Sequence, residues 1–444
     1  MLANIELLAE EQTGCCPVEP VTPEATGLNQ GMLVDLILKT LYQRGPQTGA
    51  ALAASMHLPL STLQAVLSDQ RRLHALEVTG SDRSVFGDGG YVYALTGDGD
   101  AQAQRALMRS AYIGPAPVPF EDYVASVQAQ SISSVRVSED QLEAALEDLV
   151  ISPELADEVG PAVNARSSIF FFGPPGNGKT SIATRITRLL GDAIYVPYAI
   201  EAQGSIVEFF DPVVHEPVSN GDERYDRRWV KVDRPTVVVG GELTMEDLDL
   251  VYSPIRRTYE APYQMKANGG MFLIDDFGRQ HVSPHQLLNR WIVPLENRVD
   301  FLTLQTGTKL EVPFDELIVF STNLDPQDLA DEAFLRRIKY KIHVEDPTLE
   351  EFHEIFERAA SSFSIDFDED SFTYLVNHHY RAVSRPLRSV HPRDLLDQLV
   401  ALAQYKGERP AMTPEMLDKV VRTYFAQPGD TSGDRQPLDR RRSR

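Results

Sequence analysis

The chain has 444 residues, of which 42% are hydrophobic and 24% charged, and its formal net charge at pH 7 is −23. This length predicts two or three domains with buried cores, and the negative charge argues against nucleic-acid binding by the molecule as a whole. Cys15 and Cys16 are adjacent and lack Cys or His companions at metal-ligand spacing, which argues against a disulfide framework or a zinc site and fits a reducing compartment. No apolar run reaches the roughly 18–20 residues that span a bilayer, and the N-terminus lacks a basic signal-peptide region. We expect a cytoplasmic protein that does not contact a membrane.

The N-terminal part of the chain predicts a tail followed by a small helical domain. Residues 1–29 are rich in Glu, Pro and Thr without a sustained period, and we expect a flexible tail. Within 30–112, apolar residues at helical spacing predict three helices, the second capped by Thr48 and the third by Ser61. A Gly-rich turn then leads to a strand over 91–95. Three helices followed by a two-stranded hairpin resemble a winged helix-turn-helix module.

The charge of this domain leaves two interpretations of its role open. A winged helix often binds DNA through its third helix. Residues 30–112, however, carry seven basic and seven acidic side chains, and the third helix offers only Arg71 and Arg72, at its C-terminal end. DNA readers usually carry a basic face, so we favour a protein-interaction module and keep DNA binding as the alternative. The proline-rich stretch that follows, 113–135, predicts a semi-rigid linker.

A phosphate-binding loop follows a short apolar strand. Residues 170–172 are three phenylalanines, and Gly173 and Gly178 then stand at the spacing of such a loop, followed at once by Lys179 and Thr180. Glycines let successive backbone N–H groups point at an anion, and the dipole of the next helix adds positive potential. Lys179 is suited to neutralise the β- and γ-phosphates of ATP, and the Thr180 hydroxyl to hold Mg²⁺. The residues expected to bind ATP belong to this loop and the start of its helix: Gly173, Pro174, Pro175, Gly176, Asn177, Gly178, Lys179, Thr180 and Ser181.

Two acids follow a second buried strand. Residues 271–274 form an apolar run without alternation, which is typical of a central parallel strand buried on both faces. Ligands bind beyond the carboxyl ends of such strands in an open α/β sheet. Asp275 is therefore expected to act on Mg²⁺ through its water shell, and Asp276 to polarise the attacking water. The run 317–320 predicts another buried strand, with Asn323 just beyond its end.

Further elements surround these strands. The run 283–297 has an apolar helical face, the segments 299–304 and 309–313 form a hairpin pattern, and 339–344 predicts a strand. Residues 197–265 contain strands and loops of an insertion-like region whose path the pattern does not assign.

The C-terminal part of the chain predicts helices and a tail. Thr348 and Glu351 form a capping box at the start of a helix, and three further helices follow before residue 425. Residues 426–444 are polar and end in four arginines separated by one serine, and we expect a solvated flexible tail.

The order of these features resembles the AAA+ ATPase superfamily over residues 136–425. Gly173–Thr180 is similar to its Walker A motif, Met271–Asp276 to its Walker B motif and Asn323 to sensor 1. Three arginines complete the resemblance, in which Arg337 or Arg336 corresponds to the arginine finger and Arg393 to sensor 2.

Within this superfamily the chain looks most like the branch with a β-hairpin inserted before sensor 1. That branch includes the MoxR-type chaperone ATPases and the bacterial enhancer-binding activators. The Gly-Ala-Phe-Thr-Gly-Ala loop of the activators is absent from the sequence, so activator function is not supported. The second Walker B acid is usually Glu, whereas this chain has Asp276, whose shorter side chain predicts slow hydrolysis or a shifted water.

The resemblance implies a fold and a working form. It implies an α/β P-loop core over 136–345 with a parallel sheet and a helical lid over 346–425. It also implies that the subunits form a ring, most often a hexamer, because the arginine finger of one subunit acts on the nucleotide of its neighbour. Hydrolysis would move the lid, with Arg393 reporting the γ-phosphate, and so remodel a protein client. The alternatives are a DNA-associated ATPase, such as a transcription regulator or helicase loader, and a nucleotide-dependent switch or scaffold without useful turnover.

Overall fold

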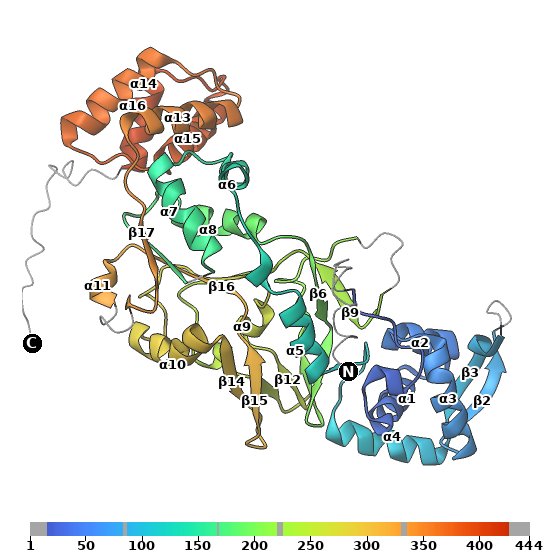
Figure 1. The fold of residues 1–444 in the computed structure, drawn as a ribbon. Coiled ribbons are helices and arrows are strands. Elements are labelled where there is room, and N and C mark those ends of the chain that lie inside the picture. Colours follow the sequence, from blue (N-terminus) through green and yellow to red (C-terminus); the bar gives the residue numbers. More distant parts are fainter. Residues whose placement is uncertain (1–15, 83–86, 167, 220–224, 330–334, 426–444) are drawn as a thin grey trace, which may run out of the picture. The chain divides into compact units, whose positions relative to one another are not determined.

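The computed structural model describes residues 16–82, 87–166, 168–219, 225–329 and 335–425 (Figure 1). By its contacts the chain divides into two compact units. Unit 1 comprises the described residues within Met1–Ala145, Asp157–Phe172 and Ala183–Ile342, and unit 2 those within Leu146–Ala156, Gly173–Ile182 and His343–Arg444. The predicted tail 426–444 and residues 1–15 of the predicted N-terminal tail lie outside the described residues.

A five-stranded sheet has the strand order β10-β13-β16-β5-β17. Its strands are β10 (Thr236–Val239), β13 (Met271–Ile274), β16 (Leu317–Thr322), β5 (Ile169–Phe172) and β17 (Tyr340–His343). The first four pair in parallel in that order. β13 and β16 are buried along their whole length, as their unbroken apolar runs predict. The α/β class with a parallel-sheet core, predicted from the sequence, is confirmed.

Aromatic side chains fill the core on this sheet. The Phe170 ring stacks on Phe320 with centroids 5.6 Å apart, which ties β5 to β16. Helix α10 (Pro284–Asn297) contributes Trp291, which is fully buried and lies 5.4 Å from Phe272 of β13. The helix begins where the sequence predicts, because Ser283 caps it in a capping box with Gln286.

The N-terminal domain (blue in Figure 1) combines helices with a small antiparallel sheet of order β1-β3-β2. Its elements are α1 (Gln30–Arg44), β1 (Gln47–Thr48), α2 (Gly49–Met56), α3 (Leu60–Arg72), β2 (Leu76–Ser81), β3 (Tyr91–Leu95) and α4 (Gly97–Arg109). The predicted cap of α2 is confirmed, since the Thr48 hydroxyl accepts a hydrogen bond from the Ala51 N–H at 3.1 Å.

In this domain one local prediction was wrong and one helix was missed. Ser61 does not cap α3, because the helix already begins at Leu60 and Pro59 holds the N-cap position in an extended conformation. Helix α4 was not predicted, because its first turn is Gly97-Asp98-Gly99, which reads as a turn. The Thr96 hydroxyl caps it by accepting from the Gly99 N–H, and a side chain at Gly99 would meet the Ala75 carbonyl at 2.0 Å.

A second five-stranded sheet, of order β11-β12-β8-β7-β4, is built mainly from the region whose path the sequence left unassigned. Its strands are β4 (Val118–Pro119), β7 (Ala199–Ala202), β8 (Ser205–Glu208), β11 (Val251–Ser253) and β12 (Thr258–Glu260). Two strand pairs lie outside the five-stranded sheets: β6 (Ile194–Pro197) with β9 (Trp229–Val232), and β14 (Val299–Thr303) with β15 (Lys309–Pro313). The latter pair is the hairpin predicted before Asn323.

Residues 113–135, predicted as a semi-rigid linker, contain a strand and a helix. They form β4, which pairs in parallel with β7, and helix α5 (Phe120–Ala129), whose Tyr123 is buried. Residues 16–29, predicted as part of a tail, also make specific contacts. The Pro20 carbonyl accepts from the Thr62 hydroxyl at 2.6 Å, and the buried Arg228 donates to the Thr26 carbonyl at 2.9 Å.

Unit 2 contains the C-terminal helices around an aromatic core. They are α13 (Leu349–Ser362), α14 (Glu369–Leu375), α15 (His391–Lys406) and α16 (Pro414–Tyr424), with a π-helical turn over Val376–Tyr380. The capping box of Thr348 and Glu351 is confirmed at the start of α13. Phe352 and Phe356 of that helix are fully buried in the shared core.

The remaining helices are short connections along the chain. They are α6 (Glu139–Leu146), α7 (Pro153–Asn164), α8 (Lys179–Ile186), α9 (Tyr263–Lys266) and α11 (Pro326–Leu329). Turns of 3₁₀ helix occur at Glu24–Thr26, Gly87–Gly90, Ile132–Ser134, Thr187–Leu189, Glu246–Leu248 and Arg381–Val383. Among the described residues no single helix is long and apolar enough to cross a membrane, whereas the bent pair α2 and α3 reaches that length and apolarity when its two helices are counted together.

A buried acid gives the stability of unit 1 a pH dependence. The Glu316 side chain is fully buried, and neither carboxyl oxygen has a hydrogen-bond partner among the described residues. Burial therefore raises its pKa well above the usual range. The folded state keeps this proton at pH values where the unfolded chain has lost it, so stability falls as pH rises above about 4.5, by up to ~1.4 kcal/mol per pH unit.

Replacing Glu316 by Met is expected to raise the free energy of unfolding by about 1–3 kcal/mol at pH 8, because an unpartnered polar group leaves the core. The gain should shrink as the pH falls toward about 4.5, because below that value both states of the wild-type chain keep the proton. Urea unfolding at pH 5 and pH 8 measures it, with the exposed Glu311→Gln as the matched control. An equal gain at both pH values would contradict a protonated Glu316.

Candidate functional site

The predicted phosphate loop lies between β5 and α8 in the structure. Strand β5 ends at Phe172, the loop follows from Gly173, and α8 begins at Lys179. Gly173, Gly176 and Gly178 have φ values of 130°, 82° and 83°, a left-handed region that residues with a side chain rarely adopt. The loop therefore needs glycine at these three positions to take this shape.

Lys179 lies inside the curve of its own loop. Its ammonium donates hydrogen bonds to the carbonyls of Gly173 and Pro174 at 2.9 and 2.8 Å, and the residue is 6% exposed. Thr180 and Ser181 follow in the first turn of α8 and are half-buried. The start of the helix thus brings together one cation, two hydroxyls and the positive end of a helix dipole, a combination suited to an anion such as a phosphate group.

The side chain of Asn177 binds segments outside the loop. Its Nδ2 donates to the Glu345 carbonyl at 2.9 Å and to Asp346 Oδ1 at 2.7 Å, and its Oδ1 accepts from the Ser389 N–H at 3.3 Å. Beside it, the Gly176 carbonyl accepts from the Val390 N–H at 2.8 Å. The sequence placed Asn177 only among the nucleotide-binding residues, whereas the structure shows a second set of contacts for its side chain.

Close packing is a further reason for the loop glycines. A Cβ atom at Gly173 would lie 2.5 Å from the Val344 carbonyl oxygen, and one at Gly176 would lie 2.7 Å from Val390 Cγ1. Both distances are too short for any side chain. The loop is therefore packed against residues next to the C-terminal helices within unit 2.

In unit 1 the structure brings two predicted residues together at the ends of neighbouring strands. Asn323, which follows β16, donates from Nδ2 to Asp276 Oδ1 at 3.2 Å. Asp276 has a φ of 49°, unusual for a residue with a side chain, and its carboxylate is exposed. Such an outlier is common at functional sites. The amide of Asn323 and the carboxylate of Asp276 therefore meet at the ends of β16 and β13.

Asp275 is held by the backbone around it. Its N–H donates to the Val239 carbonyl at 2.8 Å, and its own carbonyl accepts from Gln280 Nε2 at 2.8 Å. The carboxylate also accepts from the Asp276 N–H at 3.1 Å. These bonds fix the turn after β13 and leave Asp275 half-buried, as suits an oxygen donor near a hard cation.

The three predicted arginines occupy different surroundings. In unit 1, Arg337 donates from Nε to Glu296 Oε1 of α10 at 2.6 Å, and Arg336 is more exposed. In unit 2, Arg393 is exposed in the first turn of α15. A different arginine of unit 2, Arg388, lies beside the loop, since its Cβ is 3.9 Å from the position a Gly176 Cβ would take.

Sequence reasoning missed two residues at the loop. Asp346 accepts from Asn177 and forms an ion pair with Arg388, so one carboxyl oxygen binds both residues. Burial lowers the pKa of Arg388, but its guanidinium remains charged because an arginine pKa starts far above neutrality. An acid directly before Pro347, at the end of the last sheet strand, was the available signal.

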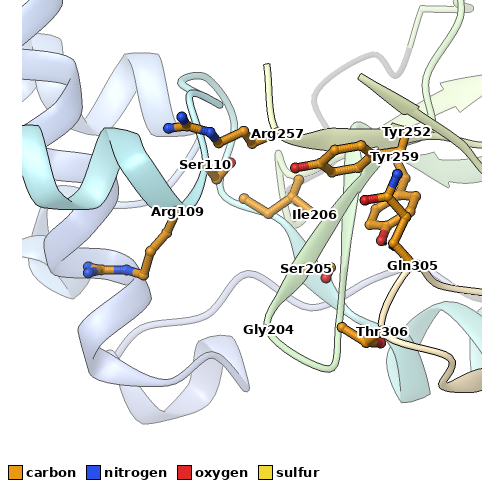
Figure 2. A pocket seen from close by; sticks show the side chains of 10 residues that line it. All are labelled: Arg109, Ser110, Gly204, Ser205, Ile206, Tyr252, Arg257, Tyr259, Gln305 and Thr306. Carbon is orange, nitrogen blue, oxygen red and sulfur yellow. Dashed lines mark hydrogen bonds between the residues drawn. The ribbon is translucent and has the colours of Figure 1, made fainter. Parts of the chain in front are cut away.

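A separate cleft of about 270 Å³ lies elsewhere in unit 1 (Figure 2). The Tyr252 and Tyr259 rings, 5.0 Å apart, lie near Gln305 of the β14–β15 hairpin, and Arg109 and Arg257 lie on the opposite side. Arg109 pairs with Asp35, and Arg257 donates to the Leu107 carbonyl. No predicted site residue lines this cleft.

Comparison with known families and curated proteins matches one part of the chain. A family model described as a domain of unknown function, DUF8689, matches residues 348–423, which correspond to the C-terminal helices of unit 2. The chain matches no curated protein. The family model therefore covers the helices that follow Asp346 and not the loop.

Solved structures match the chain at low identity and low TM-score. NtrX from Brucella abortus in complex with ADP is 16% identical, covers 75% of this chain and 68% of its own, and has a TM-score of 0.40. A RuvB variant from Thermotoga maritima is 14% identical over 62% of this chain and 70% of its own, with a TM-score of 0.36. The Holliday junction branch migration motor RuvB of the same organism is 15% identical over 65% and 70%, with a TM-score of 0.33.

Proposed function

We propose that this chain is an ATPase of the AAA+ type. The observation that carries the proposal is Lys179, buried inside a glycine loop that connects the end of a parallel strand to a helix. Strand β5 lies between β16 and β17, the fourth and fifth strands of this sheet along the chain, so the strand order reverses beside it. Open α/β sheets bind ligands at the carboxyl ends of strands at such a reversal.

Each proposed residue has a role that suits its chemistry. Lys179 and the loop N–H groups bind the phosphates of ATP, and Thr180 and Asp275 supply the hard oxygen donors that Mg²⁺ prefers. When bound, Mg²⁺ would neutralise charge on the β- and γ-phosphates. Asp276 and Asn323, already hydrogen-bonded to each other, orient and polarise the attacking water.

Replacing Asp276 by Asn is expected to leave ATP binding intact and to lower the turnover rate by about 10²–10⁴-fold, the range for a general base. The amide keeps the size of the carboxylate but accepts protons poorly. Asp276→Glu should keep or raise the rate, because Glu is the usual residue at this position of the family. Phosphate release at saturating ATP measures both variants.

Asp233→Asn, which neutralises an exposed carboxylate, is the matched control for this experiment. It should hydrolyse ATP at the wild-type rate. If Asp276→Asn also does so, Asp276 is not the water-polarising acid.

The proposed working form is a homo-oligomeric ring, most often a hexamer, in which Arg337 or Arg336 contacts the nucleotide of the next subunit. Arg337 would have to exchange Glu296 for that phosphate, whereas Arg336 is the more exposed of the two. Movement of the C-terminal helices would then remodel a protein client in the cytoplasm. Support comes from the AAA+ resemblance and from the packing of these helices' flanking residues on the loop.

We propose that the N-terminal domain is a winged helix that recruits the client. Helices α1, α2 and α3 precede strands β2 and β3, as in the predicted module. Arg72 of α3 is paired with Asp69 rather than part of a basic face. The DNA-associated alternative predicts that immobilised duplex DNA retains the full chain. This retention should fall steeply as the salt concentration rises. Such retention, absent from an Arg71→Ala/Arg72→Ala variant, would replace the client proposal.

A further inference from the structure

Asn177 uses nearly all the hydrogen-bonding capacity of its side chain on residues outside the loop. Both Nδ2 protons are donated, one to the Glu345 carbonyl and one to Asp346, and Oδ1 accepts from the Ser389 N–H. The residue is 5% exposed. A buried amide with this set of partners holds one geometry, because a shift of the loop must break or carry along these bonds.

The partners of Asn177 belong to two short segments that flank the C-terminal helices. Asp346 lies three residues before the start of α13, and Ser389 and Val390 immediately precede α15. Asp346 joins the two segments, since the same Oδ1 atom accepts from Asn177 and pairs with Arg388. The contact is therefore a three-way junction between the loop and the starts of two helices.

Both segments are firmly attached to the helices that they precede. The capping box of Thr348 fixes the start of α13 two residues after Asp346. Arg385 stacks at 3.5 Å on the ring of Phe425, the residue that follows α16, and the buried His391 at the start of α15 packs edge-on against the same ring at 5.0 Å. A displacement of Asp346 or Ser389 is therefore expected to move the packed C-terminal helices as well.

We propose that Asn177 is the positioning residue that couples the phosphate loop to the C-terminal helices. The inference rests on the proposed ATP binding by the loop. Phosphate binding requires Lys179 to turn from the carbonyls of Gly173 and Pro174 toward the ligand, which changes the curve of the loop at Gly176 and Asn177. Through Asp346 and Ser389 that change reaches α13 and α15. The Asn177 side chain acts through these partners and takes no part in hydrolysis, whereas the expected phosphate contact of residue 177 is made by its backbone N–H, which Ala keeps.

Amide hydrogen exchange of the full chain, with and without ADP, tests the coupling. In the wild type, ADP should change exchange both in the loop over 173–182 and in the helices α13 and α15. In Asn177→Ala, the Ser389 and Val390 amides should exchange about 2- to 10-fold faster without ADP, because hydrogen bonds that protect them are lost or weakened. ADP should still alter exchange in the loop of this variant but no longer in the helices.

Two further variants separate coupling from simple destabilisation. Asn377→Ala removes an exposed amide of the same unit and should behave as wild type. Asn177→Asp places a second carboxylate against Asp346 and should uncouple the loop from the helices. Adding Asp346→Asn to this variant should partly restore the coupling, because the amide and the carboxylate then exchange places. A general loss of stability would not be reversed by this second substitution.

The outcomes distinguish the two proposals. If ADP alters exchange in the helices of Asn177→Ala as much as in the wild type, the coupling role is overturned and ATP binding stands. If ADP alters no exchange in the wild-type loop, ATP binding fails and the coupling role fails with it.

Discussion

Replacing Lys179 by Ala is expected to weaken ATP binding by about 10²–10⁴-fold while the chain stays folded. Within the loop Lys179 is the cation, and its ammonium already lies between loop carbonyls, buried at the start of α8. A charge-assisted hydrogen bond is worth about 1.5–3 kcal/mol, and the ammonium is expected to donate to two phosphate oxygens. The loss should therefore appear in the nucleotide dissociation constant.

Titration with a fluorescent ATP analogue measures this constant, and circular dichroism tests the fold. Lys419→Ala, which removes an exposed lysine of α16 in the same unit, is the matched control and should bind as wild type. Unchanged affinity of Lys179→Ala with an intact spectrum would overturn the assignment of the loop. Loss of the spectrum would instead show that the two carbonyl contacts of Lys179 hold the loop.

Replacing Arg337 by Ala is expected to lower turnover by about 10³–10⁵-fold, the contribution of an arginine finger, and to change ATP affinity little. Within its own subunit Arg337 is paired with Glu296, so the substitution removes one partly exposed ion pair, which contributes little to stability. The large effect would come from the phosphate of the neighbouring subunit. Steady-state hydrolysis and nucleotide titration separate the two quantities.

Mixing Arg337→Ala with Lys179→Ala subunits tests whether the site is shared. Each variant can donate what the other lacks, so the mixture should recover activity that neither shows alone. Arg336→Ala is the matched variant, and if it shows the larger loss, Arg336 is the finger. Turnover independent of protein concentration in a strictly monomeric sample would contradict a site between subunits.

Local signals in the sequence predicted much of the parallel sheet and of the candidate site. The apolar runs of β13 and β16 indicate strands buried on both faces, and Gly173, Gly178 and Lys179 indicate the loop, because each depends on residues next to one another in the chain. The caps Thr48 and Thr348 were predicted for the same reason. Thr236–Val239 lies in the region whose path the sequence left unassigned, since pairing with β13 is a property of residues about 35 positions apart.

Only the tertiary structure decided the contacts between distant segments. The sequence by itself determined that a glycine loop with Lys179 follows a strand and that Asp275, Asp276 and Asn323 stand at strand ends. It could not show that Asn177 binds Asp346 and Ser389, nor that Asn323 binds Asp276, because those partners are 47 to 212 positions away. Residues 113–135 show the same contrast between local signals and distant contacts. Their prolines indicate a linker, whereas β4 is stabilised by pairing with β7. Secondary-structure propensity depends on neighbouring residues in the sequence, whereas these hydrogen bonds and the burial of side chains depend on residues that are distant in the sequence.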